Sequence, residues 1–129
     1  MDAPPSRNAS PREGLVCVVD DDEAVRRALD NLLASAGYAS ISFASAEACL
    51  ASGRRDDFVF AVLDIALGGM DGFALQQRLC AGKPLPLVFL SAHDDAGTRR
   101  RAFDAGALAL LRKPVDADRL FSHIAAALS

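Results

Sequence analysis

The sequence has no hydrophobic run long enough to cross a bilayer, which takes roughly 20 consecutive apolar residues. Apolar runs such as Leu15–Val19 and 107–111 are only five residues long. Residues 1–14 are rich in Pro, Ser and Ala and lack the apolar core of a secretory signal. We therefore expect a cytoplasmic protein without membrane contact, with residues 1–14 as a flexible tail before a single domain over 15–129.

Cysteine is also scarce, and basic residues do not outnumber acidic ones. Cys17, Cys49 and Cys80 are widely spaced in apolar surroundings, a pattern typical of reduced core thiols rather than of disulfides or a metal site. The net charge is −3, whereas nucleic-acid-binding domains usually carry a concentrated basic face. We therefore expect that this chain itself binds no nucleic acid.

Short apolar runs alternate with segments of helical period. Five runs predict buried strands, at 15–19, 38–43, 58–63, 87–90 and 107–111. Five segments predict helices, at 23–36, 45–50 (with Ser45 as cap), 73–80, from Asp94 or Asp95 to 105, and from Asp116 or Asp118 to 128. This alternation predicts an α/β fold of five βα units, with a doubly wound, five-stranded parallel sheet covered by helices on both faces.

Carboxylates follow two of the predicted strands. Asp20, Asp21 and Asp22 come after the first strand, and Asp64 comes after the third. Because the carboxyl ends of parallel strands meet at one edge of a sheet, we expect these acids to converge. Crowded carboxylates repel one another unless a cation lies among them, and oxygen ligands suit Mg²⁺. Asp22 is accounted for as a helix cap, but Asp20, Asp21 and Asp64 exceed any need for capping.

A hydroxyl and an amine are placed at the same edge. Ser91 ends the fourth strand and Lys113 follows the fifth. Alone, Ser91 would be an ordinary loop serine and Lys113 a surface lysine with a buried stem. Beside the acids, Lys113 is placed to attract a carboxylate and any anion bound to the metal, and Ser91 to donate to a phosphoryl oxygen.

Six stretches in this order resemble the receiver domains of two-component response regulators, the CheY-like superfamily. They are 18–23, 63–64, 70–72, 90–92, 104–107 and 112–114. The resemblance runs from Leu15 to the C-terminus, and the set is specific although no single stretch is. It implies the flavodoxin-like strand order 2-1-3-4-5.

The resemblance also implies how the acids act. Asp64 would accept the phosphoryl group, and Asp21 would bind Mg²⁺ directly. Asp20 would ligate directly or through water, and the main-chain carbonyl of Ala66 would be a further ligand. In such a reaction the carboxylate attacks phosphorus while the metal and Lys113 neutralise charge on the transferring oxygens. The domain would be a signalling module limited to self-phosphorylation and autodephosphorylation, not an enzyme.

The remaining implications concern the switch and the partners. Ser91 would take the hydroxyl position, Lys113 would pair with the phosphate, and Lys113–Pro114 is a candidate cis peptide. The donor would be a sensor histidine kinase or a phosphotransfer protein. A homodimer would form through the face built by the helix ending at 105, the strand 107–111 and the last helix. The sequence leaves open whether an effector domain accompanies this receiver in a longer regulator.

Two positions depart from the family pattern. Gly68 stands four residues after Asp64, where a proline is common, so the loop is expected to be more flexible. Leu110 stands where the family usually has Tyr or Phe, and this puts the usual aromatic relay in doubt.

Arg99, Arg100 and Arg101 predict either a solvated helix face or a partner-binding patch.

Three alternatives share parts of this pattern. A flavodoxin-like nucleotide or flavin binder would need a phosphate loop after the first strand, where three aspartates would repel phosphate. A phosphohydrolase with an aspartyl nucleophile would need a second acid and usually a cap domain. A receiver used only for docking would not need all of the acids.

Overall fold

The computed structural model describes residues 14–93 and 95–129. The predicted tail, apart from Gly14, and the candidate cap Asp94 lie outside the described residues. Within the described residues there are five strands: β1 (Leu15–Val19), β2 (Ser40–Phe43), β3 (Phe58–Asp64), β4 (Leu87–Ser91) and β5 (Ala109–Arg112). They form one parallel sheet in the order β2-β1-β3-β4-β5, which confirms the predicted fold class and strand order.

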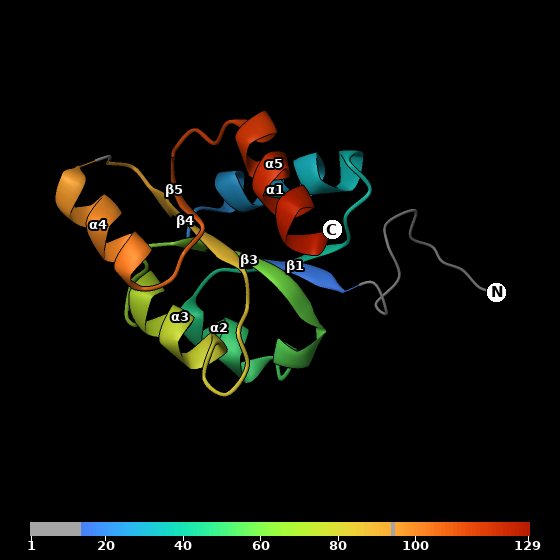
Figure 1. The fold of residues 1–129 in the computed structure, drawn as a ribbon. Helices are drawn as coiled ribbons and strands as arrows, with labels where there is room; N and C mark the ends of the chain where they lie inside the picture. The colour runs from blue at the N-terminus through green and yellow to red at the C-terminus, as the bar shows by residue number, and fades with distance from the viewer. Residues whose placement is uncertain (1–13, 94) are drawn as a thin grey trace.

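Helices cover both faces of the sheet (Figure 1). They are α1 (Glu23–Ser35), α2 (Ala46–Ala51), α3 (Gly72–Leu79), α4 (Ala96–Asp104) and α5 (Ala117–Leu128), with a short 3₁₀ turn over Arg55–Asp57. None of the helices in the described part of the chain is long and apolar enough to cross a membrane. Residues from α1 and α5 pack in one buried cluster, and residues from α2, α3 and α4 pack in another on the opposite face.

Alternation along the strands divides the core between these two layers. In β1, Val16 and Val18 join the cluster under α1 and α5, whereas Cys17 and Val19 join the one under α2 and α3. Cys17 and Cys49 are buried with their Sγ atoms 3.7 Å apart, and Cys80 is partly exposed. All three cysteines are free; Cys17 and Cys49 lie in the core as predicted, whereas Cys80 packs against its edge.

Every α-helix begins at a side chain that accepts a hydrogen bond from a first-turn N–H group. The capping residues are Asp22, Ser45, Asp71, Asp95 and Asp116. Asp116 rather than Asp118 therefore caps α5. Several aspartates in the loops at the carboxyl edge of the sheet are therefore explained by capping of the helix that follows.

Two strands begin two residues later than predicted, because the preceding helix ends use the backbone of those residues. The Tyr38 N–H donates to the Leu33 carbonyl at 2.9 Å after Gly37, whose φ of +87° ends α1. The Ala107 N–H likewise donates to the Ala102 carbonyl at 3.1 Å, so β5 begins at Ala109. Apolar character identified both strands but overstated their burial, since β2 is only half-buried and Leu108 is exposed, and it did not fix where each strand begins.

Candidate functional site

The predicted acids converge at the carboxyl edge of the sheet. β1 and β3 are neighbours with Val19 paired to Leu63, so Asp20 and Asp64 follow paired positions. Carboxylate oxygens of Asp20, Asp21 and Asp64 all lie within 4.8 Å of one another. Asp20 is fully buried and Asp64 is 3% exposed, whereas Asp21 faces solvent. The cluster is therefore accessible from solvent at Asp21.

Lys113 reaches two of these acids at once. Its Nζ lies 2.8 Å from Asp20 Oδ2 and 3.1 Å from Asp64 Oδ2. The Lys113–Pro114 peptide bond is cis, as predicted. The Lys113 N–H donates to the Ser91 carbonyl at 2.9 Å, so the lysine is attached to the end of β4. The amine is thereby held between the ends of β1 and β3.

Ser91 lies at the same edge. It directly follows Leu90, which pairs with Asp64, and it is itself 8% exposed. Its Oγ accepts a hydrogen bond from the His93 N–H at 3.1 Å. Because that contact uses an oxygen lone pair, the hydroxyl hydrogen of Ser91 remains able to donate to a group bound at the acids.

Backbone N–H groups and one arginine fix the carboxylates. Asp20 Oδ1 accepts from the Asp22 N–H at 2.9 Å, and Asp64 Oδ1 accepts from the Ala66 N–H at 3.1 Å. The Arg26 guanidinium donates to the Asp20 carbonyl at 2.7 Å. Sequence reasoning missed Arg26, because nothing in the spacing of α1 indicates that this side chain turns back to the strand end.

The charges of the site are unbalanced. Burial raises the pKa of Asp64 and the Asp20 charge adds to this, while the Ala66 N–H and Lys113 act in the opposite direction. Burial alone would lower the pKa of Lys113, but Asp20 and Asp64 outweigh it and the pKa is raised. Three carboxylates thus face one amine, and a positive charge is still needed.

The donor set suits a hard divalent cation. The three carboxylates supply oxygen ligands, and Asp21 leaves the cluster accessible from solvent. Asp20 Oδ2 is buried, and its ion pair with Lys113 Nζ at 2.8 Å leaves a further lone pair of this oxygen available. A buried carboxylate oxygen with an unused lone pair is the kind of atom that a cation would satisfy. The residues present therefore fit Mg²⁺.

Without divalent cations, Asp64→Asn is expected to stabilise the fold at neutral pH, raising Tm by about 4 °C, or roughly 1 kcal/mol in a domain of this size. The folded-state pKa of Asp64 is raised, so its contribution to stability is present below the ordinary aspartate pKa and is lost as pH rises through the raised value. The gain should therefore shrink near about pH 4. Calorimetry in a chelator at both pH values would measure it, and a lower Tm for Asp64→Asn at neutral pH would contradict it.

The two departures from the family pattern have different surroundings. Gly68 is exposed, and a Cβ built on it would meet nothing within 4 Å. Leu110 is 5% exposed on β5, pairs with Phe89 and belongs to the core cluster on the α2 and α3 side. Leu110 is thus a packed core residue rather than a side chain free to turn outward.

Fold and site together define a flavodoxin-like α/β domain with a cluster of carboxylates at its strand ends that could hold a divalent cation. The family model of the response regulator receiver domain matches residues 16–125. The chain is 38% identical over 106 residues to the C4-dicarboxylate transport transcriptional regulatory protein DctD of Rhizobium meliloti, covering 81% of this chain and 23% of DctD. It is 35% identical over 117 residues to the transcriptional regulatory protein FixJ of Bradyrhizobium diazoefficiens, covering 90% of this chain and 57% of FixJ.

Solved structures agree. A response regulator receiver protein from Burkholderia phymatum superimposes with a TM-score of 0.76 at 37% identity, covering 89% of this chain and 94% of that one. This chain belongs to the response regulator receiver domain family, a family of signalling domains in two-component systems. It spans 23% and 57% of the lengths of DctD and FixJ. The family favours the receiver over the nucleotide-binding and phosphohydrolase alternatives.

Proposed function

We propose that this chain accepts a phosphoryl group on Asp64 in a Mg²⁺-dependent reaction and that the phosphorylated state controls a partner or an effector domain. The observation that carries this proposal is the placement of Asp64. Its Oδ2 lies 3.1 Å from Lys113 Nζ, and its carboxylate lies within 4.8 Å of those of Asp20 and Asp21. A buried carboxylate beside a fixed amine and two further acids is suited to attack phosphorus and to tolerate the charge of the product.

Asp20, Asp21, Asp64 and the Ala66 carbonyl would hold the Mg²⁺. When bound, the cation supplies neutralising charge for the oxygens of the transferring group. Asp64 forms the new oxygen–phosphorus bond as the phosphorus–nitrogen bond of the donor phosphohistidine breaks. The raised pKa of Asp64, caused mainly by burial, makes its ionised oxygen more basic than that of an exposed aspartate.

Lys113 and Ser91 would respond to the new group. Lys113 is held charged by Asp20 and Asp64, and it would pair with a phosphoryl oxygen once Asp64 is modified. Ser91 has a hydroxyl hydrogen available for the same group, so its loop would move toward the site. Since Leu110 replaces the usual ring, the response would pass to β5 by repacking of a leucine rather than by an aromatic rotamer change.

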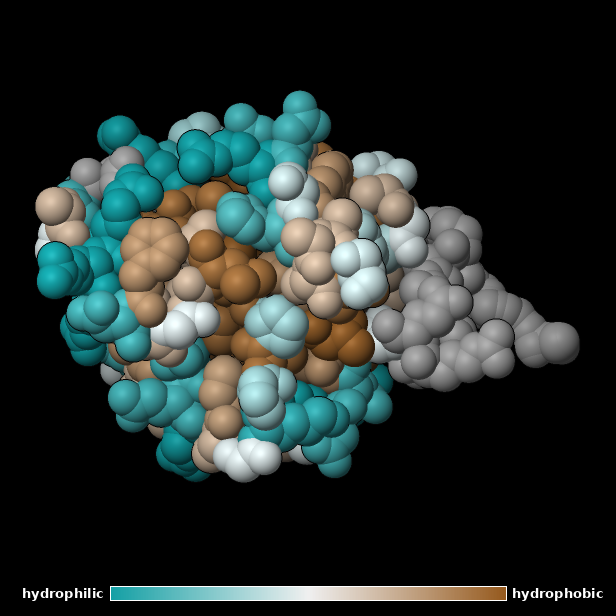
Figure 2. Space-filling model, in the orientation of Figure 1, coloured by the Kyte–Doolittle hydropathy of each residue, from teal (hydrophilic) through white to brown (hydrophobic). Residues whose placement is uncertain are grey.

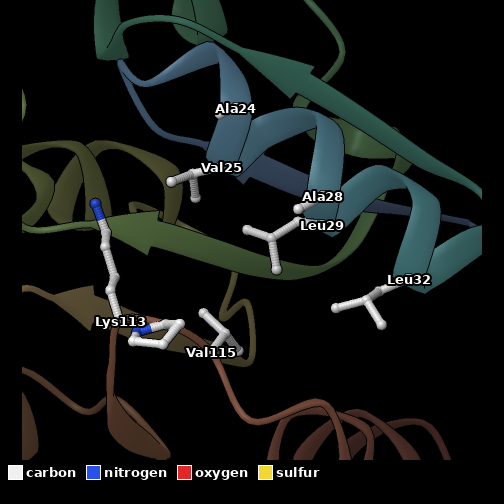
Figure 3. A pocket seen from close by; sticks show the side chains of 8 residues that line it. Ala24, Val25, Ala28, Leu29, Leu32, Lys113 and Val115 are labelled. Carbon is white, nitrogen blue, oxygen red and sulfur yellow. The ribbon is translucent and has the colours of Figure 1, made fainter.

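A pocket beside Lys113 fits a docking phosphodonor, which we propose is a sensor histidine kinase or a phosphotransfer protein. The pocket measures about 270 Å³ and is lined by Ala24, Val25, Ala28, Leu29, Leu32, Lys113, Pro114 and Val115. Figure 3 shows Val25 and Leu29 of α1 facing Val115, with Lys113 extending along one side. Apolar side chains of a donor seated here would place its phosphohistidine near the amine that contacts Asp64.

The α4-β5-α5 face is proposed as the surface of a homodimer. Phe103 on α4 is 54% exposed and Leu108, just before β5, is 42% exposed. Figure 2 shows hydrophobic surface between α4 and α5, bordered by hydrophilic residues. Arg99 and Arg100 line a shallow hollow with Phe103, so these two arginines lie beside the exposed apolar side chain, whereas the Arg101 guanidinium lies over the Phe73 ring.

Incubation with Mg²⁺ and acetyl phosphate tests the proposed function. Intact mass spectrometry should show one added phosphoryl group on the wild-type chain, and none on Asp64→Asn or in the presence of a chelator. Gel filtration of the same phosphorylated sample should show an earlier elution volume if the homodimer forms. An unmodified wild-type chain would indicate a receiver that serves only for docking, and modification of Asp64→Asn would place the acceptor elsewhere.

A further inference from the structure

Helix α2 is joined to the loop that follows Asp64. Glu47, in the first turn of α2, has its Oε2 atom 3.0 Å from the Met70 N–H, which donates to it. The two residues are 23 positions apart in the chain, so this is a tertiary contact. The bond from Met70 lowers the pKa of the Glu47 carboxyl, so at neutral pH the accepting oxygen is charged.

Gly69 makes the close approach of Glu47 possible. Its φ is +73°, a conformation that favours glycine. A Cβ built on Gly69 would lie only 2.9 Å from Glu47 Oε2. Glycine at this position thus allows the backbone conformation of the loop and leaves room for the Glu47 carboxylate to reach the Met70 N–H.

The loop that follows Asp64 includes backbone in direct contact with that acid. The Ala66 N–H donates to Asp64 Oδ1, and the Gly72 N–H donates to the Ile65 carbonyl at 3.0 Å, which closes the base of the loop. Its tip contains Gly68 and Gly69, which have many accessible backbone conformations when they are not held. Glu47, on α2, accepts a hydrogen bond from the Met70 N–H, which directly follows Gly69 and lies four residues after Ala66.

We propose that Glu47 is a positioning residue, which fixes the loop over residues 65–71 so that the Ala66 carbonyl faces the cation site. This inference rests on the proposed function, because it assumes that the acids bind Mg²⁺. With the loop held at its base and at its tip, the backbone near Ala66 has few alternatives. Without Glu47, each binding event would also have to order two adjacent glycines, which costs conformational entropy.

Glu47→Ala should therefore weaken Mg²⁺ binding without disabling the chemistry. We expect the calorimetric Kd for Mg²⁺ to rise about tenfold, the lower end of the usual range for residues that orient metal ligands. The Mg²⁺ concentration that half-saturates the rate with acetyl phosphate should rise in parallel, while the rate at saturating Mg²⁺ stays unchanged. Glu47→Gln, whose amide oxygen still accepts from Met70, should restore most of the affinity.

Glu23→Ala is the matched control. Glu23 is also an exposed first-turn glutamate, on α1, and its contact is with Arg27 rather than with the loop. It removes the same charge near the strand ends but leaves residues 65–71 untouched. Amide exchange of Met70, measured by NMR in the metal-free protein, should accelerate in Glu47→Ala and should match the wild type in Glu23→Ala.

The outcomes separate the two proposals. A wild-type chain that binds no Mg²⁺ would contradict the proposed function, independently of the role of Glu47. A wild-type chain that binds Mg²⁺, with an unchanged Kd in Glu47→Ala, would overturn the role of Glu47 even if Met70 exchange accelerates. Equal losses in Glu47→Ala and Glu23→Ala would also overturn it, since they would reflect charge alone. If Glu47→Ala does not fold, a wild-type Kd combined with accelerated Met70 exchange in Glu47→Gln decides against the proposal.

Discussion

Asp21→Asn is expected to slow phosphorylation of Asp64 by at least about 100-fold at a fixed, low Mg²⁺ concentration, because it removes a proposed direct ligand of the cation. Asp21 is the exposed member of the cluster, and its carboxylate lies within 4.8 Å of those of Asp20 and Asp64. An exposed Asp→Asn change should leave the fold intact, so the loss would report on metal binding. The rate of mass gain with acetyl phosphate, measured over a Mg²⁺ titration, checks the prediction.

Asp22→Asn provides a matched control for Asp21→Asn. Asp22 is the next residue and is also exposed, and its carboxylate caps α1 by accepting from the Ala24 N–H at 2.9 Å. Asparagine is nearly as good a helix cap as aspartate, so this variant should keep both stability and phosphorylation. If the two variants slow the reaction equally, Asp21 acts only through its charge and is not a ligand.

Gly72→Ala is expected to lower the free energy of unfolding by about 3 kcal/mol or more, through overpacking against a backbone that cannot give way. A Cβ on Gly72 would collide with the carbonyl oxygen of Asp64 and lie 2.9 Å from the Ile65 Cα. The Gly72 N–H also donates to the Ile65 carbonyl, so the two backbone segments are already in direct contact. Relief of the clash would have to displace Asp64 itself. Equilibrium urea unfolding of both proteins measures the loss.

Gly68→Ala is the matched control for Gly72→Ala, because it adds the same methyl group to the loop before α3 without a clash. No atom lies within 4 Å of a Cβ built on Gly68, and its φ is outside the left-handed region. This change should stabilise the fold slightly, by up to about 1 kcal/mol, because alanine restricts the unfolded chain. If Gly72→Ala were as well tolerated as Gly68→Ala, α3 would not be packed against the end of β3 as described.

The convergence of the acids could be predicted from the sequence because it follows from topology. Once the apolar runs before Asp20 and Asp64 were assigned to parallel strands, their carboxyl ends had to meet at one edge. The register that pairs Val19 with Leu63 sets how close the acids come, and no pattern in the sequence encodes it. The double contact of Lys113 with Asp20 and Asp64 depends on this register and was not predicted.

The contacts made by long polar side chains could not be predicted from the sequence, for a different reason. Arg26 and Glu47 are both first-turn or second-turn helix residues with several rotatable bonds, and their partners are backbone groups of other segments. Spacing along α1 or α2 shows only that such residues lie away from the core. Which backbone group they meet depends on how the loops run, and therefore on the folded structure.

The most direct test is a crystal structure of the chain grown with Mn²⁺, which takes oxygen ligands as Mg²⁺ does and is located by its anomalous scattering. We predict one anomalous peak at the strand ends, coordinated by the carboxylates of Asp21 and Asp64 and by the Ala66 carbonyl, with Lys113 still beside Asp64. A map with no peak among Asp20, Asp21 and Asp64, or with the ion bound on another side of the molecule, would contradict the proposed site.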